Sequence, residues 1–129
     1  MAERSVIRTE RAPAPFQGAP YSQAIRVGDL VFVSGQLGVR PGGSDMVGDT
    51  IAEQTEQVMA NLGAILEEAG SGLDRLVKTT VFLANLADFQ GMNEVYSRHV
   101  GDRPPARSTV EVAALPSGAL VEIEAVGAI

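Results

Sequence analysis

Apolar and polar residues change their spacing several times along the chain, and each change predicts a different kind of element. Alternating apolar residues predict strands in "SVIRT" and on both sides of "VGD" in "YSQAIRVGDLVFVSG", where the tripeptide is a typical hairpin turn. "RLVKTTVFLAN" predicts a further strand because it is rich in β-branched side chains. The Pro- and Gly-rich segments "APAPFQGAP" and "VRPGGSDMVGD" predict loops.

Two segments have helical spacing instead. The first runs from Thr50 to Ala69, with Thr50 as the N-cap, Glu53 reaching back in a capping box, and Gly70 closing the helix. Its apolar residues lie on one face and predict a stripe against the core: Ile51, Val58, Met59, Leu62, Ile65, Leu66 and Ala69. The second helix is predicted in "NLADFQGMNEVYSRHV", with Asn85 as its N-cap.

The closing stretch "PPARSTVEVAALPSGALVEIEAVG" predicts two more strands joined by a turn. The order of elements is then strands, helix, strand, helix, strands. This order predicts an α+β fold in which one mixed sheet carries both helices on one face. The length of 129 residues and the lack of any repeat or long linker favour one domain over residues 1–129.

The two closing strands place charges among apolar residues. Because side chains alternate along a strand, the Val and Ile residues are predicted to face the helices. The opposite face then carries a charged set: Arg107, Thr109, Glu111, Glu122 and Glu124. Phe32, Leu120 and Val126 share that face, which suggests that a second copy of the protein covers it. The alternative is a solvated face on which Arg and Glu form cross-strand pairs.

Composition reduces the range of possible functions. The net charge of −6 and the absence of a Lys/Arg cluster make a nucleic-acid partner improbable. With no cysteine and a single histidine, His99, neither a metal site nor a thiol nucleophile is expected, and the lack of cysteine fits a cytoplasmic protein. The sequence has no run of 18 apolar residues, so no membrane span is predicted. The first residues lack the apolar segment of a signal peptide.

Three collinear segments resemble the RidA/YjgF family of enamine/imine deaminases. These are "PARSTVEVAALPSGALVEIEAVG", "PYSQAIRVGDLVFVSGQLGV" and "VKTTVFLANLADFQGMNEVY", which together cover most of residues 19–127. The resemblance implies a chorismate-mutase-like fold and a homotrimer with a central barrel-like core. It also implies three active-site clefts between subunits. The substrates it implies are small carboxylates, 2-aminoacrylate-type enamines and 2-imino acids, which are hydrolysed to 2-oxo acids and ammonia.

The resemblance also implies a role for individual residues. Arg107 matches the family's carboxylate-binding arginine, and a planar guanidinium suits a bidentate contact with a carboxylate. Glu122 matches the water-positioning glutamate, although Glu124 is an alternative and either could simply pair with Arg107. Tyr21 matches the active-site tyrosine, which could bind the substrate nitrogen or close the cleft. The substrate-binding positions are Ser34, Gly35, Asn93 and Thr109.

Two departures from the family pattern bear on substrate choice. Thr109 stands where members often have cysteine, and the loop Phe16–Ala19 differs from the usual glycine before Pro-Tyr. The expected reaction needs positioning and acid–base help only, so no metal or organic cofactor is required. The alternatives are a non-catalytic small-molecule binding or regulatory trimer, and a pathway-specific enzyme for a larger imine or enamine. The endoribonuclease label that the family has also carried conflicts with the acidic charge.

Overall fold

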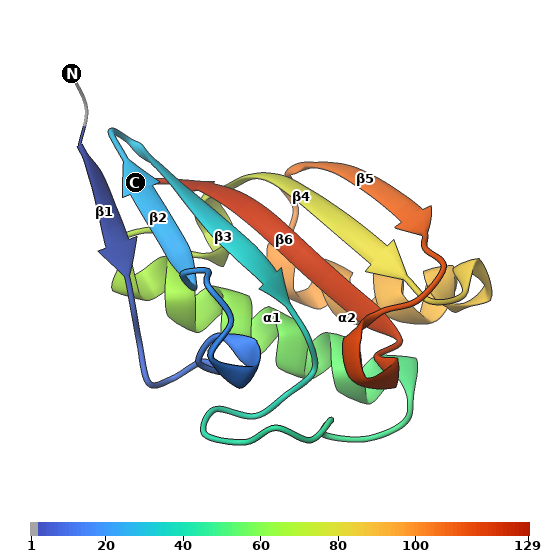
Figure 1. Ribbon diagram of the computed structural model, residues 1–129. Coiled ribbons are helices and arrows are strands. Elements are labelled where there is room, and N and C mark those ends of the chain that lie inside the picture. Colours follow the sequence, from blue (N-terminus) through green and yellow to red (C-terminus); the bar gives the residue numbers. More distant parts are fainter. Residues whose placement is uncertain (1–2) are drawn as a thin grey trace.

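The computed structural model describes residues 3–129, which form a mixed six-stranded sheet with two helices on one face (Figure 1). The strands are β1 (Arg4–Ile7), β2 (Ala24–Val27), β3 (Leu30–Gln36), β4 (Leu76–Leu83), β5 (Ala106–Glu111) and β6 (Val121–Ala128). The helices are α1 (Ile51–Glu68) and α2 (Phe89–Val100), and the short 3-10 turns are η1 (Phe16–Gly18), η2 (Leu73–Arg75), η3 (Leu86–Asp88) and η4 (Pro116–Gly118). The predicted α+β fold class and the single helical layer are confirmed.

The strand order in the sheet is β1-β2-β3-β6-β4-β5. All neighbours are antiparallel except β4 and β5, which are parallel because α2 connects them as a crossover. The last strand, β6, therefore lies in the middle of the sheet, between β3 and β4. This placement brings the C-terminal "VEIE" segment beside the end of β3.

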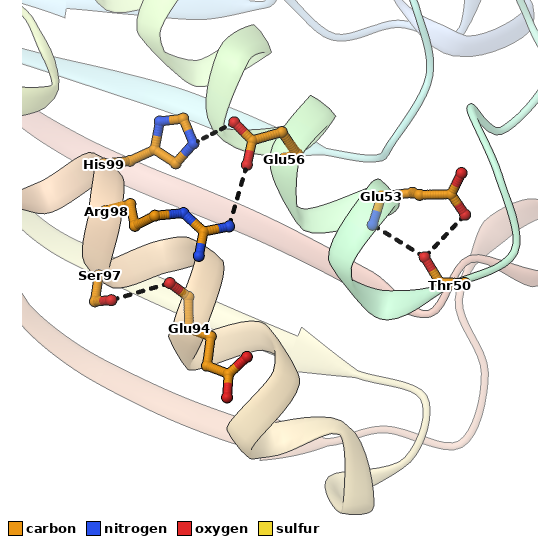
Figure 2. A network of polar contacts seen from close by, with 7 residues as sticks. All are labelled: Thr50, Glu53, Glu56, Glu94, Ser97, Arg98 and His99. Carbon is orange, nitrogen blue, oxygen red and sulfur yellow. Dashed lines mark hydrogen bonds and ion pairs between the residues drawn. The ribbon is translucent and has the colours of Figure 1, made fainter.

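The ends of α1 follow from its local sequence. Thr50 is the N-cap, and its hydroxyl accepts a hydrogen bond from the backbone N–H of Glu53 at 3.1 Å. The Glu53 carboxylate reaches back to the Thr50 hydroxyl at 2.8 Å, rather than to its backbone N–H as in a standard capping box (Figure 2). At the other end Gly70 has φ +89°, the left-handed conformation that closes many helices.

The second helix begins one turn later than the sequence predicts. Asn85 caps η3, where its side chain accepts from the N–H of Ala87, and α2 itself begins at Phe89 after Asp88. Near its end, Nε2 of His99 lies 2.8 Å from Oε1 of Glu56 on α1 (Figure 2). His99 thus connects the two helices.

The core lies between the helices and the sheet. The predicted stripe of α1 is confirmed, because Val58, Met59, Leu62, Ile65 and Leu66 are fully buried there. They pack against the apolar side chains that the central strands turn towards the helices: Val31, Val33, Val81, Leu83, Val121, Ile123 and Ala125.

The prediction for the faces of the sheet is half correct. Glu122 and Glu124 of β6 do lie on the face away from the helices, since their neighbours Val121, Ile123 and Ala125 are buried. The prediction is wrong for β5. Its register pairs Arg107 with Thr79 and Thr109 with Val81, both buried beneath the helices.

Arg107, Thr109 and Glu111 therefore face the helix side, and Glu111 accepts the N–H of Leu86 at the start of η3. The apolar residue of β5, Val110, is 42% exposed on the open face. There it pairs with Phe82 of β4, while Phe32 pairs with Val126 of β6. The open face thus carries an apolar band across the sheet. None of the helices in residues 3–129 is long and apolar enough to cross a membrane.

Candidate active site

A cavity of about 1300 Å³ opens at the end of the sheet where β3 finishes and β6 begins. Four of the predicted site residues line it: Tyr21, Ser34, Gly35 and Glu122. They come from the loop before β2, the end of β3 and the start of β6, so the sheet order brings them together. The pairing of β3 with β6 is irregular between Val33 and Gln36, which places the Ser-Gly pair at a bulge facing the cavity.

Glu122 lies directly against Gly35. A Cβ atom at position 35 would lie 2.5 Å from Oε2 of Glu122 and 2.8 Å from its Cδ, so only glycine leaves room for this carboxylate. Burial raises the pKa of the Glu122 carboxyl above its ordinary value, and the nearby Glu124 carboxylate raises it further. A carboxyl group with a raised pKa, held at the wall of a cavity, is a candidate for acid–base chemistry.

Tyr21 and Ser34 already have partners within the chain. The hydroxyl of Tyr21 accepts the backbone N–H of Phe16 at 2.6 Å, which leaves its own proton available to an acceptor in the cavity. The hydroxyl of Ser34 donates to the carbonyl of Ser22 at 2.7 Å, so this side chain holds the wall of the cavity in place.

Replacing Gly35 with alanine is expected to displace the Glu122 carboxylate. The new methyl group would collide with the flexible end of a side chain rather than with backbone, so the free energy of unfolding should change by less than about 1 kcal/mol. Any catalytic activity that depends on the placement of this carboxylate should fall by about 10²-fold. Steady-state kinetics and urea denaturation test this, and the double variant with Glu122→Gln should be no less active than Glu122→Gln alone. Additive losses in the double variant would contradict the contact.

Arg107 lies outside this cavity, against α2. Its guanidinium carbon is 4.9 Å from the ring centroid of Tyr96 and 5.6 Å from that of Phe89, and a terminal nitrogen lies 4.0 Å from the sulfur of Met92. The Tyr96 ring is itself fixed, because its hydroxyl is 2.6 Å from Oγ1 of Thr79. Two aromatic rings thus hold a half-buried cation in a defined position.

No carboxylate of residues 3–129 forms an ion pair with Arg107. The predicted alternative in which it pairs with Glu122 or Glu124 is therefore wrong within one chain, because those residues lie on the other face of the sheet. A half-buried guanidinium without a counter-ion is costly unless something else neutralises it. The N–H groups of the guanidinium are therefore suited to bind an anion.

Thr109 and Asn93 accompany Arg107. Thr109 follows it on the same face of β5, and its Oγ1 is buried without a hydrogen-bond partner among residues 3–129. Asn93 lies on α2 one residue after Met92 and four after Phe89, so it shares the helix face that contacts the guanidinium. These three residues form a second group, which we call the arginine group. The four cavity residues Tyr21, Ser34, Gly35 and Glu122 form the glutamate group.

The sequence reasoning missed the residues that hold Arg107. On α2, the spacing i, i+3, i+7 of Phe89, Met92 and Tyr96 indicates that these side chains share one helix face. Only the structure shows that this face receives an arginine.

Comparison with known proteins agrees with this architecture. The family model described as Endoribonuclease L-PSP matches residues 9–129. A RutC family protein of Pyrococcus abyssi is 50% identical over 123 residues, covering 95% of this chain and 95% of that protein. The human 2-iminobutanoate/2-iminopropanoate deaminase is 43% identical over 123 residues, covering 95% of this chain and 88% of that protein.

Among solved structures, the crystal structure of Escherichia coli TdcF with bound serine has a TM-score of 0.89 and 36% identity, and covers 97% of this chain and 98% of that chain. The match to the family model covers nearly the whole chain, and the human relative bears the name of a deaminase. This chain therefore belongs to the RidA/YjgF family.

Proposed function

We propose that this protein hydrolyses 2-imino acids, and the 2-aminoacrylate-type enamines that tautomerise to them, to 2-oxo acids and ammonia. One observation carries the proposal: the guanidinium of Arg107 is held over two aromatic rings with no carboxylate partner. A planar cation fixed in this way suits a bidentate contact with a substrate carboxylate. The name of the human relative and the serine bound to TdcF support a substrate derived from an amino acid.

Glu122 acts on the water in this proposal. Its carboxylate, held against Gly35, orients a water molecule towards the C=N carbon and accepts a proton as the C–O bond forms. The same proton then passes to the nitrogen, which gives a carbinolamine. Glu122 next takes the proton of the new hydroxyl group and delivers it to the nitrogen, so that the C=O bond forms as the C–N bond breaks; ammonia is released and the 2-oxo acid remains. Its raised pKa makes the Glu122 carboxylate a stronger proton acceptor in these transfers. Tyr21, whose hydroxyl proton is available, donates a hydrogen bond to the substrate nitrogen or closes the cleft.

The reaction requires both groups of residues, and one chain holds them on different faces of its sheet. We therefore propose that the arginine group of one copy meets the glutamate group of another in a homotrimer of the chorismate-mutase-like type. The apolar band on the open face, with Phe32 45% and Val110 42% exposed, supports such an assembly, because water would otherwise contact it. Substrate would then bind between subunits.

Co-expression of two impaired variants tests this arrangement. If Arg107→Ala and Glu122→Gln chains mix at random in trimers, about a quarter of the intersubunit sites combine an intact Arg107 with an intact Glu122. At substrate concentrations below KM, the purified mixture should therefore regain about a quarter of the wild-type rate, whereas each variant alone should keep about a hundredth of it or less. Light scattering of the wild type should give three times the 13.5 kDa chain mass. A monomer, or a mixture no more active than the single variants, would disprove the shared site.

The wild-type assay also separates hydrolysis from binding alone. The imine is generated in situ by a dehydratase, and its loss is followed with and without the protein. A rate equal to the spontaneous one, together with measurable binding of a 2-oxo acid, would identify a non-catalytic binding trimer instead.

A further inference from the structure

Two short turns that border the cavity have nearly identical backbones. In η1, Gln17 has φ +53° and ψ +30°, and in η4, Ser117 has φ +56° and ψ +27°. Each is followed by a left-handed glycine, Gly18 at φ +69° and Gly118 at φ +68°. Both turns lie at the end of the sheet where β3 finishes, one in the blue part of the ribbon and the other in the red (Figure 1).

Gln17 and Ser117 are the only non-glycine residues with positive φ in residues 3–129. L-residues rarely adopt this conformation, and glycine or asparagine would do so with less strain. Both strained residues line the same cavity as Tyr21 and Glu122. Strained backbone that is concentrated at one cavity points to a use for the side chains that it presents.

Hydrogen bonds to other parts of the chain anchor the backbone beside each strained residue. The N–H of Phe16 in η1 donates to the hydroxyl of Tyr21 at 2.6 Å. Beyond η4, the N–H of Leu120 donates to Oε1 of Gln54 at 2.8 Å, and the buried Gln54 side chain also donates to the carbonyl of Gly48. The backbone is thus anchored close to both Gln17 and Ser117.

The side chains of Gln17 and Ser117 form no hydrogen bond with any part of the chain that the structure describes, and both are exposed. Each follows an apolar residue of the cavity wall, Phe16 and Pro116 respectively. Both turns thus present the same sequence of surfaces to the cavity: an apolar ring, then an uncharged side chain that can donate and accept hydrogen bonds.

We propose that Gln17 and Ser117 form a subsite for the substrate side chain, selective for 2-imino acids with a short apolar stem and an uncharged polar end, such as a carboxamide. This proposal rests on the proposed hydrolysis. The stem packs on Phe16 and Pro116, and the polar end bonds to the amide and hydroxyl. The cavity volume of about 1300 Å³ leaves ample room for such a side chain beyond the reacting carbon.

The test compares two imines of similar length, generated in situ from glutamine and from methionine by an amino-acid oxidase. The wild type should have the higher kcat/KM for the glutamine-derived imine. In the double variant Gln17→Gly/Ser117→Gly the ratio of the two kcat/KM values should fall about tenfold, or about 1.4 kcal/mol. Because glycine adopts positive φ freely, the midpoint of thermal unfolding should stay within about 3 °C of the wild type or rise.

Two further variants sharpen the result. Gln17→Asn keeps an amide at a position that asparagine tolerates, and should retain most of the wild-type ratio. Ser5→Gly on the exposed strand β1, outside the cavity, should leave the ratio unchanged. An unchanged ratio in the double variant would overturn the subsite while leaving the proposed hydrolysis intact. A lower thermal midpoint with loss of the assembly would also overturn it, because the two side chains would then contact another copy. A wild type active on 2-iminobutanoate but on neither longer imine would overturn the subsite alone, and one inactive on all three would overturn the hydrolysis and the subsite with it.

Discussion

Replacing Arg107 with alanine is expected to lower kcat/KM for 2-iminobutanoate by about 10²–10³-fold, since a bidentate charge-assisted contact contributes about 3–4 kcal/mol. The loss should appear mainly in KM for binding of the carboxylate, with a smaller fall in kcat from poorer alignment of the C=N carbon. Arg107→Lys should recover only part of the loss, because an ammonium lacks the planar fork. Steady-state kinetics on an imine generated in situ measures these effects.

The matched control is Arg103→Ala, an exposed arginine in the loop just before β5. It removes the same charge without touching the aromatic rings of α2, and should leave kcat/KM within about twofold of the wild type. Stability should change little in Arg107→Ala, because the guanidinium has no ion-pair partner and loses only cation–π contacts of about 1 kcal/mol. Wild-type kinetics in Arg107→Ala would show that the substrate carboxylate does not bind to Arg107.

Replacing Glu122 with glutamine is expected to lower kcat by about 10²–10⁴-fold, the range for losing a positioned proton acceptor. In the wild type, activity should fall as the pH is lowered through the raised pKa of Glu122, since the protonated carboxyl cannot accept a proton from water. That acidic limb should disappear from the residual activity of Glu122→Gln. The pH dependence of kcat/KM measures the pKa in the free protein.

Glu124→Gln is the matched control for this residue. Glu124 is the next glutamate on the same face of β6, and its charge is the second cause of the raised pKa, after burial. Its removal should therefore keep kcat at its optimum but move the acidic limb to lower pH. An equal loss of kcat in Glu124→Gln would show that the two glutamates had been assigned to the wrong roles.

The raised pKa of Glu122 also predicts how stability depends on pH. Protonation is favoured in the folded state, so the contribution of this group to stability is fully present below its ordinary pKa of 4.5 and is lost as the pH rises through the raised folded pKa. Glu122→Gln, which cannot ionise, should therefore be more stable than the wild type at neutral pH and similar to it at pH 4. Urea denaturation at the two pH values would detect the difference. A variant less stable than the wild type at neutral pH would contradict it.

Local sequence was sufficient for the elements and for the glutamate group. Hydrophobic spacing and capping residues predicted α1 to within one residue at each end, because Thr50 and Gly70 act through short-range hydrogen bonds. Motif resemblance selected Tyr21, Ser34, Gly35 and Glu122, and the pairing of β3 with β6 then brings these residues to one cavity. The close contact of Glu122 with Gly35 was not predictable, since it depends on a bulge between two strands distant in sequence.

The face of β5 could not be predicted from alternation. The two-residue repeat of a strand shows which side chains share a face, but it does not show which face points inward. A shift of one residue exchanges the two faces. In a strand at the edge of the sheet, Val110 lies outward with Phe82, whereas Arg107 lies inward on the rings of α2. An apolar residue on the open face misled the assignment, because apolar residues mark the inside only where the other face meets water.

The sequence by itself determined the secondary structure, the class of fold and the residue types of the site, because these depend on short-range patterns and on recognisable motifs. Only the tertiary structure decided that Arg107 and Glu122 lie on different faces of one sheet. The reason is physical: the crossover through α2 sets the register of β5 against β4, and that register determines which side chains meet the helices.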